Sequence, residues 1–162
     1  LFPYTTLFRS TKDTYCGLFQ PQNPHKYLGN LTQIVYRSSY EVRFMKWCDL
    51  NENVLQWGSE EIVIPYVSPA DNKPHRYFVD FFIKIKTKDG SIKKYLVEVK
   101  PYRFTQEPIP PKRKTKNFIN EVVLWAVNNA KWDSARKVAS MRGWEFMLIT
   151  EKDLGLLPTA HK

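Results

Sequence analysis

Three polar side chains lie among the apolar residues of the stretch "YFVDFFIKIKTKDGSIKKYLVEVKP", which covers residues 77–101. They are Asp80, Glu98 and Lys100. Alternating β-formers on both sides of a "TKDG" turn predict a β-hairpin here. Two carboxylates on neighbouring strands can bind a hard cation, and a lysine beside them can act on a water molecule in hydrolysis. This chemistry requires a hairpin register that brings the three groups together.

The turn determines that register. Gly90 suits a type I turn closed by a left-handed residue, which gives a three-residue loop and pairs Thr87 with Ser91. Counting back from this pair places Asp80 opposite Glu98. A two-residue Asp-Gly turn would instead put the two carboxylates on opposite faces. We favour the longer loop, because carboxylates held across a strand pair repel each other unless a cation lies between them.

Strand alternation then separates the hairpin into two faces. The polar residues share one face, and the other should be the core face. The residues expected on this core face are Val79, Phe81, Ile83, Tyr95, Val97 and Val99.

Further groups could complete the site. Lys100 lies on the same face as Glu98, where it could orient or deprotonate a water molecule or neutralise a phosphate. The carbonyl of Val99 could add a metal ligand, and Glu41 could hold a second ion or a metal-bound water. A plainer role for Glu41 is to stabilise the start of its helix through the helix dipole. Lys100, likewise, could be an ordinary lysine at a strand edge.

The elements that would position these groups follow a readable order. Ser38 or Ser39 can cap a helix that runs to about Asp49, with Tyr40, Phe44 and Trp47 at helical spacing. A strand follows at 60–67, on which Pro65 indicates an edge position or a bulge. The pattern then predicts these elements: a loop at 68–75, the hairpin, a proline-rich basic loop at 101–116, two helical stretches within 117–143 closed by Gly143, a buried strand at 144–150 and a short helix at 151–157.

Composition indicates one globular domain with a polyanionic partner. Of the 162 residues, 43% are hydrophobic, which is enough for a core, and 25 Lys and Arg against 16 Asp and Glu give a formal charge of +9. Double-stranded DNA is the first candidate partner, although many small basic proteins are merely soluble.

The cysteines, Cys16 and Cys48, suggest neither a disulfide framework nor a zinc site. No apolar run approaches the roughly 20 residues of a membrane span, so no membrane partner is expected.

Several cations could contact the DNA backbone without reading its sequence. The alternative for each is a solvated surface charge. The main candidates are Arg76, Arg103, Lys112, Arg113, Lys114 and Lys116, with Lys84, Lys86, Lys93 and Lys94 as additional ones.

The beginning of the chain is expected to lie outside the fold. In "LFPYTTLFRS", residues 1–10, the last nine letters look like the translation of a common sequencing adaptor. We therefore expect an artefact at 1–10 and a single domain at 11–162.

An Asp, a turn and then Glu-x-Lys on adjacent strands, downstream of an acidic helix, resembles the PD-(D/E)xK nuclease superfamily. The Pro of that name has no counterpart, since Val79 precedes Asp80. From about Tyr27 to Leu157 the chain is similar to the head-completion nucleases of tailed phages, which are related to the endonuclease subunit of heteromeric transposases. The segments that carry this similarity are "YRSSYEVRFMKWCD", "WGSEEIVIPY", "RYFVDFF", "VEVKP", "FINEV", "KW" and "ITEKDL".

The resemblance implies an α/β fold with a restriction-endonuclease-like core, ordered as helix, three strands, helix and strand around a central mixed sheet. It implies a nuclease dependent on Mg²⁺, or on Mn²⁺, with Glu41, Asp80, Glu98 and Lys100 as catalytic residues. Such a protein cleaves or trims packaged DNA so that phage heads and tails can join. It would act in the host cytoplasm during assembly or as a virion component, with head or tail-connector proteins as partners.

Two alternatives stay open at this stage. One is a transposase-type or restriction-like endonuclease, and the other is a non-catalytic DNA-binding protein that joins head to tail. The sequence also leaves open whether cleavage is endonucleolytic or exonucleolytic.

Overall fold

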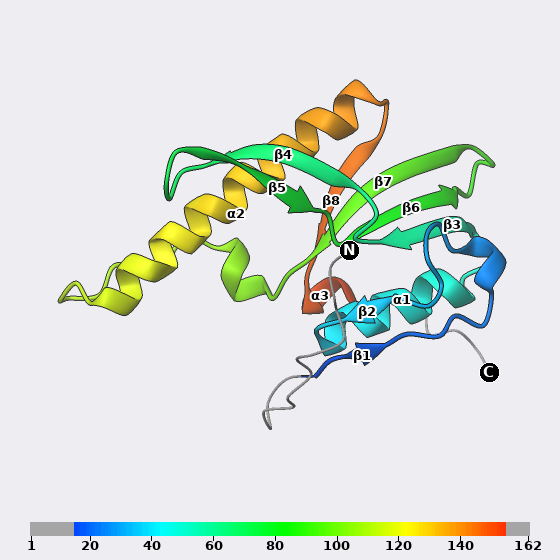
Figure 1. The fold of residues 1–162 in the computed structure, drawn as a ribbon, viewed down its shortest axis with the longest axis horizontal. Helices are drawn as coiled ribbons and strands as arrows, with labels where there is room; N and C mark the ends of the chain where they lie inside the picture. The colour runs from blue at the N-terminus through cyan, green and yellow to red at the C-terminus, as the bar shows by residue number, and fades with distance from the viewer. Residues whose placement is uncertain (1–14, 155–162) are drawn as a thin grey trace.

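A four-stranded mixed sheet forms the centre of the protein. The computed structural model describes residues 15–154, so the segment 1–10 lies outside the described residues. The strands, in their order across the sheet, are β3 (Val54–Ser59), β6 (Phe81–Lys86), β7 (Ile92–Val99) and β8 (Glu145–Ile149). β6 runs antiparallel to both of its neighbours, β3 and β7, and β8 runs parallel to β7 (Figure 1). The expected α/β fold with a central mixed sheet is confirmed.

Helix α1 (Ser39–Leu50) packs on one face of this sheet. It begins where expected, because the Ser38 hydroxyl caps it by accepting a hydrogen bond from the backbone N–H of Glu41 at 3.1 Å. Phe44 and Met45 on its inner side are fully buried against the sheet. The remaining elements of the N-terminal region and this face are β1 (Gly17–Leu18), η1 (Pro24–Lys26), β2 (Val35–Tyr36) and α3 (Glu151–Leu154).

Helix α2 (Lys116–Met141) covers the opposite face (Figure 1). The prediction of two separate helical stretches is wrong, because a single inner stripe continues along the whole second half of the helix. That stripe consists of Asn128, Trp132, Ala135 and Ala139. The helix ends as predicted at Gly143, whose φ of 67° allows the Trp144 N–H to bond back to the Ala139 carbonyl at 2.8 Å.

A separate two-stranded ribbon lies beside α2 and consists of β4 (Val63–Ser68) and β5 (Lys73–Phe78). Along the chain, five strands therefore separate α1 from α2, and not the three that were expected. Strand β3 was not predicted, and β5 begins inside the stretch 68–75 that was expected to be a loop. Pro65 lies in a ribbon with only one partner strand, which agrees with the edge position expected for it.

The hairpin has the register predicted from its turn. Phe81 pairs with Val97, the Thr87 N–H donates to the Ser91 carbonyl at 2.8 Å, and Gly90 has a φ of 85°. The assignment of a single core face is wrong, however. Phe82 and Leu96, on the supposed polar face, are buried beneath α2, and Val79 belongs to that cluster as well. Helices cover both faces of the sheet, so its strands are apolar on both sides.

A β-bulge interrupts the long strand that was expected at 77–86. The strand ends at Phe78 and resumes at Phe81. In the opposing chain, three residues at 60–62 face the two residues Val79 and Asp80, because Ser59 pairs with Phe81 whereas Val63 pairs with Phe78. Glu60 at the bulge has a φ of 57°. Bulges of this kind redirect a strand and re-aim its side chains.

The last expected elements differ in detail from the structure. The proline-rich loop contains a short 3-10 helix, η2 (Tyr102–Thr105). Strand β8 was expected to be buried, yet it is an edge strand on which Met147 is 36% exposed. None of the helices within 15–154 is long and apolar enough to cross a membrane.

Candidate active site

The bulge places Asp80 at the end of the central sheet, next to the last residues of β7. The backbone carbonyl of Asp80 accepts from the Glu60 N–H at 3.1 Å, which fixes the main chain at this point. Its side-chain Oδ2 accepts from the backbone N–H of Val99 at 2.9 Å. Asp80 is thereby held across the strand pair from Glu98, as the register predicted.

Glu98 is a buried carboxylate with a partner on each oxygen. It is 3% exposed and lies on the α2 side of the sheet with Leu96. Its Oε1 is 3.0 Å from the Lys100 Nζ, and its Oε2 accepts from the Tyr77 hydroxyl at 2.6 Å. The structure therefore brings together Asp80, Glu98 and Lys100, three of the four residues predicted to be catalytic.

Tyr77 belongs to this site and was not predicted. It lies on β5, is 4% exposed, and reaches Glu98 only because the β4–β5 ribbon folds over the sheet. Burial, followed by the charge of Glu98, raises the pKa of Tyr77, so the hydroxyl stays protonated and donates. Strand periodicity contains no signal for this contact, because Tyr77 looks like any other aromatic residue of a strand.

The electrostatics of Asp80 indicate a site that is short of positive charge. Burial, and next the charge of Glu98, raise the pKa of Asp80 well above its ordinary value. The Val99 N–H and the Lys100 charge oppose this shift without cancelling it. A cation beside the two carboxylates would relieve this repulsion.

Glu41 lies near the site but is engaged elsewhere. Its charge contributes weakly to the raised pKa of Asp80. Its carboxylate, however, accepts from the Arg37 N–H at 2.7 Å and from the Ser38 hydroxyl at 3.1 Å, at the start of α1. This is the plainer helix-terminus role. In the region 15–154, no three His, Cys, Asp or Glu side chains lie together closely enough to hold a metal ion.

The donors nevertheless suit a hard divalent cation in chemical type. Asp80 and Glu98 offer carboxylate oxygens, which Mg²⁺ prefers, and the burial of Glu98 would keep them dry. The Lys100 ammonium forms an ion pair with Glu98 Oε1, so a bound cation would compete with Lys100 for that oxygen. Val99 takes part through its N–H, and a ligand role for its carbonyl remains a prediction.

The basic residues do not form one patch around this site. Arg76 lies on β5 with its guanidinium 5.6 Å from the centre of the Phe78 ring, and Arg103 lies on η2. Lys112, Arg113, Lys114 and Lys116 are exposed at the outer end of α2 (Figure 1). Lys93 forms an ion pair with Glu145 at 3.0 Å. The basic loop therefore stands apart from the carboxylates and could only contact DNA at a distance from them.

Comparison with known proteins agrees with this fold. The family model described as "TnsA-like endonuclease N terminal" matches residues 51–151, a range that contains Asp80, Glu98 and Lys100. This chain belongs to the TnsA-like endonuclease family, whose fold is restriction-endonuclease-like. It is also 40% identical over 147 residues to the head completion nuclease of Enterobacteria phage T4, across 88% of this chain and 95% of that protein. The resemblance seen in the sequence is confirmed, and so is the class of nuclease.

Proposed function

We propose that this protein is a DNA nuclease that depends on a divalent metal, with Mg²⁺ as the metal and Asp80, Glu98 and Lys100 at its centre. The observation that carries the proposal is the buried Glu98, held between Lys100 and Tyr77 beside an Asp80 of raised pKa. A buried carboxylate pair is costly unless hydrogen bonds and a cation compensate it, and acidic groups with perturbed pKa values gather at catalytic sites.

Each residue has a role that follows from its contacts. Asp80 and Glu98 would bind the metal, which would supply positive charge against the phosphate. Lys100 has its ammonium at the mouth of the site with 28% of its side chain exposed, so it can orient the attacking water or stabilise charge on the phosphate. Tyr77 fixes Glu98 in place. Glu41 could help to bind the metal only if its carboxylate gave up its hydrogen bonds to the Arg37 N–H and the Ser38 hydroxyl.

The test is cleavage of a supercoiled plasmid by the protein in Mg²⁺, in Mn²⁺ and in EDTA. Nicking in Mg²⁺ that stops in EDTA supports the proposal. A closed circle has no ends, so nicking would also identify endonucleolytic cleavage, whereas degradation restricted to linear DNA would identify an exonuclease. Binding of DNA without cleavage in any divalent metal would instead favour a non-catalytic joining protein.

We also propose that the biological role is completion of phage heads, by cleaving or trimming packaged DNA so that tails can join. The likeness over nearly the full length of the T4 head completion nuclease supports this role. Phage head or tail-connector proteins would be partners, and the host cytoplasm during assembly would be the location. Supplying this chain in trans to a phage that lacks its own head completion nuclease should restore joining. An active nuclease that fails to restore it would favour a transposase-type or restriction-like endonuclease.

A further inference from the structure

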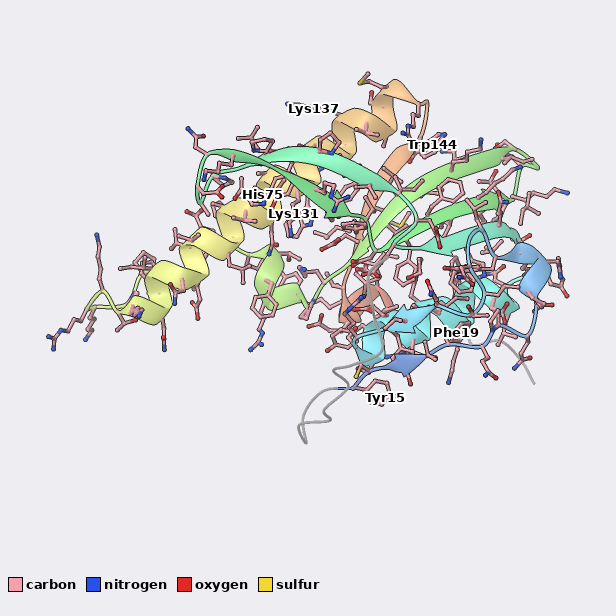
Figure 2. The ribbon with its side chains drawn as sticks, in the orientation of Figure 1. Tyr15, Phe19, His75, Lys131, Lys137 and Trp144 are labelled. Atoms are coloured by element: carbon pink, nitrogen blue, oxygen red, sulfur yellow. The ribbon has the colours of Figure 1, made fainter. Side chains whose placement is uncertain are left out.

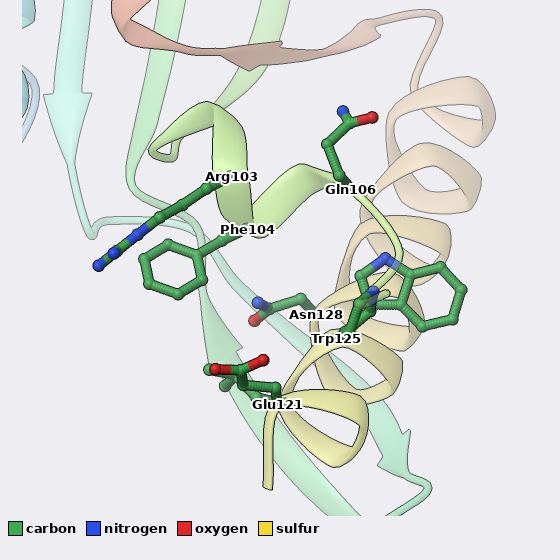
Figure 3. Close-up of a pocket in the computed structure, with 8 residues that line it drawn as sticks. Arg103, Phe104, Gln106, Glu121, Trp125 and Asn128 are labelled. Carbon is green, nitrogen blue, oxygen red and sulfur yellow. The ribbon is translucent and has the colours of Figure 1, made fainter. Parts of the chain in front are cut away.

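A cavity of about 400 Å³ lies next to the candidate active site, between η2 and the first half of α2 (Figure 3). Its volume falls within the range of roughly 300–1,000 Å³ that is typical of small-ligand sites. On one side, η2 begins two residues after Lys100. On the other side, Asn128 of the cavity precedes Lys131 by three residues of α2, a rise of about 4.5 Å. The Lys131 Nζ is 5.7 Å from the centre of the Tyr77 ring, so the stretch of α2 that directly follows the cavity lies near the hydrogen-bond partner of Glu98.

Asn128 gives the cavity a polar group that the fold itself does not use. It is 4% exposed and occupies the inner stripe of α2, where an apolar residue would be expected. Its side-chain amide has no hydrogen-bond partner among the described residues, but the amide atoms are not fully enclosed, so water or a ligand in the cavity can bond to them. Figure 3 shows this amide pointing from α2 toward the ring of Phe104. The Asn128 amide is therefore available to a ligand that enters the cavity.

The other walls show what kind of ligand fits. Phe104 and Trp125 offer aromatic faces, and the Arg103 guanidinium lies 4.4 Å from the centre of the Phe104 ring. Aromatic rings and guanidinium planes are surfaces on which an unstacked base can stack. The amides of Gln106 and Asn128 provide both donors and acceptors, as the edge of a base requires.

One further wall residue argues against a phosphate ligand. The carboxylate of Glu121 lines the cavity and would repel an anion, whereas it can accept from the N–H groups of a base. We propose that the cavity binds a single unpaired nucleobase of the DNA substrate, next to the phosphate that is cleaved. The inference deepens the proposed nuclease function and rests on it. It implies that the protein prefers DNA that is frayed, unpaired or distorted at the cleavage site.

The test measures binding in EDTA, where cleavage does not interfere. The probes are two short single strands of equal length and charge, one of thymidine nucleotides and one abasic throughout. The full chain should bind the thymidine strand at least about fivefold more tightly than the abasic strand, which is the lower end of the effect of stacking one base on an aromatic side chain. Equal affinity for both strands would overturn the proposal.

Two substitutions assign the preference to the cavity. Trp125→Ala and Asn128→Leu should each reduce the ratio of the two dissociation constants toward one, and thermal melting should confirm that the variants are folded. Leucine suits a buried stripe, so Asn128→Leu is expected to fold even if Trp125→Ala does not. Val123→Ala, an exposed position on the same helix outside the cavity lining, should keep the ratio. Retention of the ratio in folded Asn128→Leu would contradict the proposal.

This binding measurement and the nuclease assay can fail independently. A wild-type protein that nicks plasmid in Mg²⁺ but binds both strands equally would retain the proposed function and lose the base site. A protein that prefers the thymidine strand but never cleaves DNA would keep the base site and lose the function.

Discussion

At the scale of single residues, the hydrogen bond from Tyr77 to Glu98 is the contact of the candidate site that could not be predicted from the sequence. The hydroxyl donates at 2.6 Å to one carboxylate oxygen while Lys100 lies 3.0 Å from the other. Groups that orient a metal-binding carboxylate in this way usually contribute tenfold to hundredfold to metal affinity or activity. If Glu98 binds the metal as proposed, Tyr77 is expected to be a positioning residue, because its hydroxyl would act through Glu98.

Tyr77→Phe should lower the cleavage rate by about 10-fold to 100-fold and raise the Mg²⁺ concentration needed for half-maximal activity. The ring still fills its place in the core, so the melting temperature should change little. Tyr66→Phe is the matched control, because Tyr66 lies in the same cluster and its hydroxyl has no hydrogen-bond partner within the described residues. Equal cleavage by Tyr77→Phe and wild type, at limiting Mg²⁺, would disprove the positioning role.

Asp80 should destabilise the metal-free fold at neutral pH, because burial and the charge of Glu98 disfavour the ionised form of its carboxyl group. Its pKa is raised on folding, so its stabilising contribution is present below the unfolded value of about 3.9 and is lost as the pH rises through the folded value. In EDTA at neutral pH, Asp80→Asn should therefore melt at a higher temperature than wild type, by about 2–4 °C for each kcal/mol recovered.

The same variant separates metal binding from folding. Mg²⁺ in excess should raise the melting temperature of the wild-type protein, since it binds the folded state, and should leave Asp80→Asn almost unchanged. The advantage of the variant in EDTA should disappear toward pH 4. A variant that melts below wild type in EDTA, or responds equally to Mg²⁺, would contradict this description of the site.

At the scale of elements, the bulge between the two sheets determines where Asp80 points. Glu60 occupies the left-handed region there, with a φ of 57°, and its carboxylate is paired with Arg37. Left-handed backbone costs a residue with a side chain about 1–2 kcal/mol, and a β-branched residue more. Glycine adopts this conformation without that cost.

We expect Glu60→Gly to keep the stability within about 1 kcal/mol and to keep the nuclease activity, whereas Glu60→Val should destabilise the protein by roughly 1–2 kcal/mol or more. Urea denaturation measures the free energy of unfolding of both variants. Neither variant can form the ion pair with Arg37, so the difference between them reports the backbone conformation alone. If valine were tolerated as well as glycine, the left-handed bulge would not be a constraint on the site.

The loop before α2 is the element best placed to hold DNA away from the cleavage site. From Lys131 to Lys116 the helix rises about 22 Å, which corresponds to six or seven base pairs at about 3.4 Å each. The three cations of this loop, Lys112, Arg113 and Lys114, are exposed. They could contact the phosphate backbone of a duplex whose scissile phosphate lies at Asp80.

Replacing Lys112, Arg113 and Lys114 with serine should weaken duplex binding without abolishing cleavage at saturating protein. The slope of log K against log salt concentration should become shallower by about 0.9 for each phosphate that the loop no longer neutralises. Lys46→Ser, at an exposed position of α1, provides a control for the removal of a surface charge. An unchanged salt slope in the triple variant would show that the loop does not touch DNA.

At the scale of the whole molecule, the parts that could be predicted are those fixed by local chemistry. The turn at Gly90 determines the register that pairs Asp80 with Glu98, and Ser38 marks the start of α1. Local rules failed where distant segments meet. The bulge at Asp80 depends on β3 and β5, which were not predicted as strands. Tyr77 reaches Glu98 from the β4–β5 ribbon, which is separate in sequence from the strand that carries Glu98.

The cavity beside α2 could not be predicted for the same reason. It forms where η2 meets a helix that was expected to be broken into two. Asp80, Glu98 and Lys100 could be proposed from the sequence because charged residues are unusual on buried strands, whereas an aromatic residue or an asparagine is common in many settings.

Whether Asp80 and Glu98 form a metal-dependent site for cleaving DNA can be decided by the single-turnover cleavage rate of Asp80→Asn in Mg²⁺ at saturating protein. Asp133→Asn, at an exposed carboxylate on α2, is the matched control. We expect Asp80→Asn to bind DNA as tightly as wild type and to cleave it at least about 1,000-fold more slowly, which corresponds to about 4 kcal/mol less transition-state stabilisation, while the control cleaves normally. Cleavage by Asp80→Asn within about tenfold of wild type would show that these carboxylates are not the metal site.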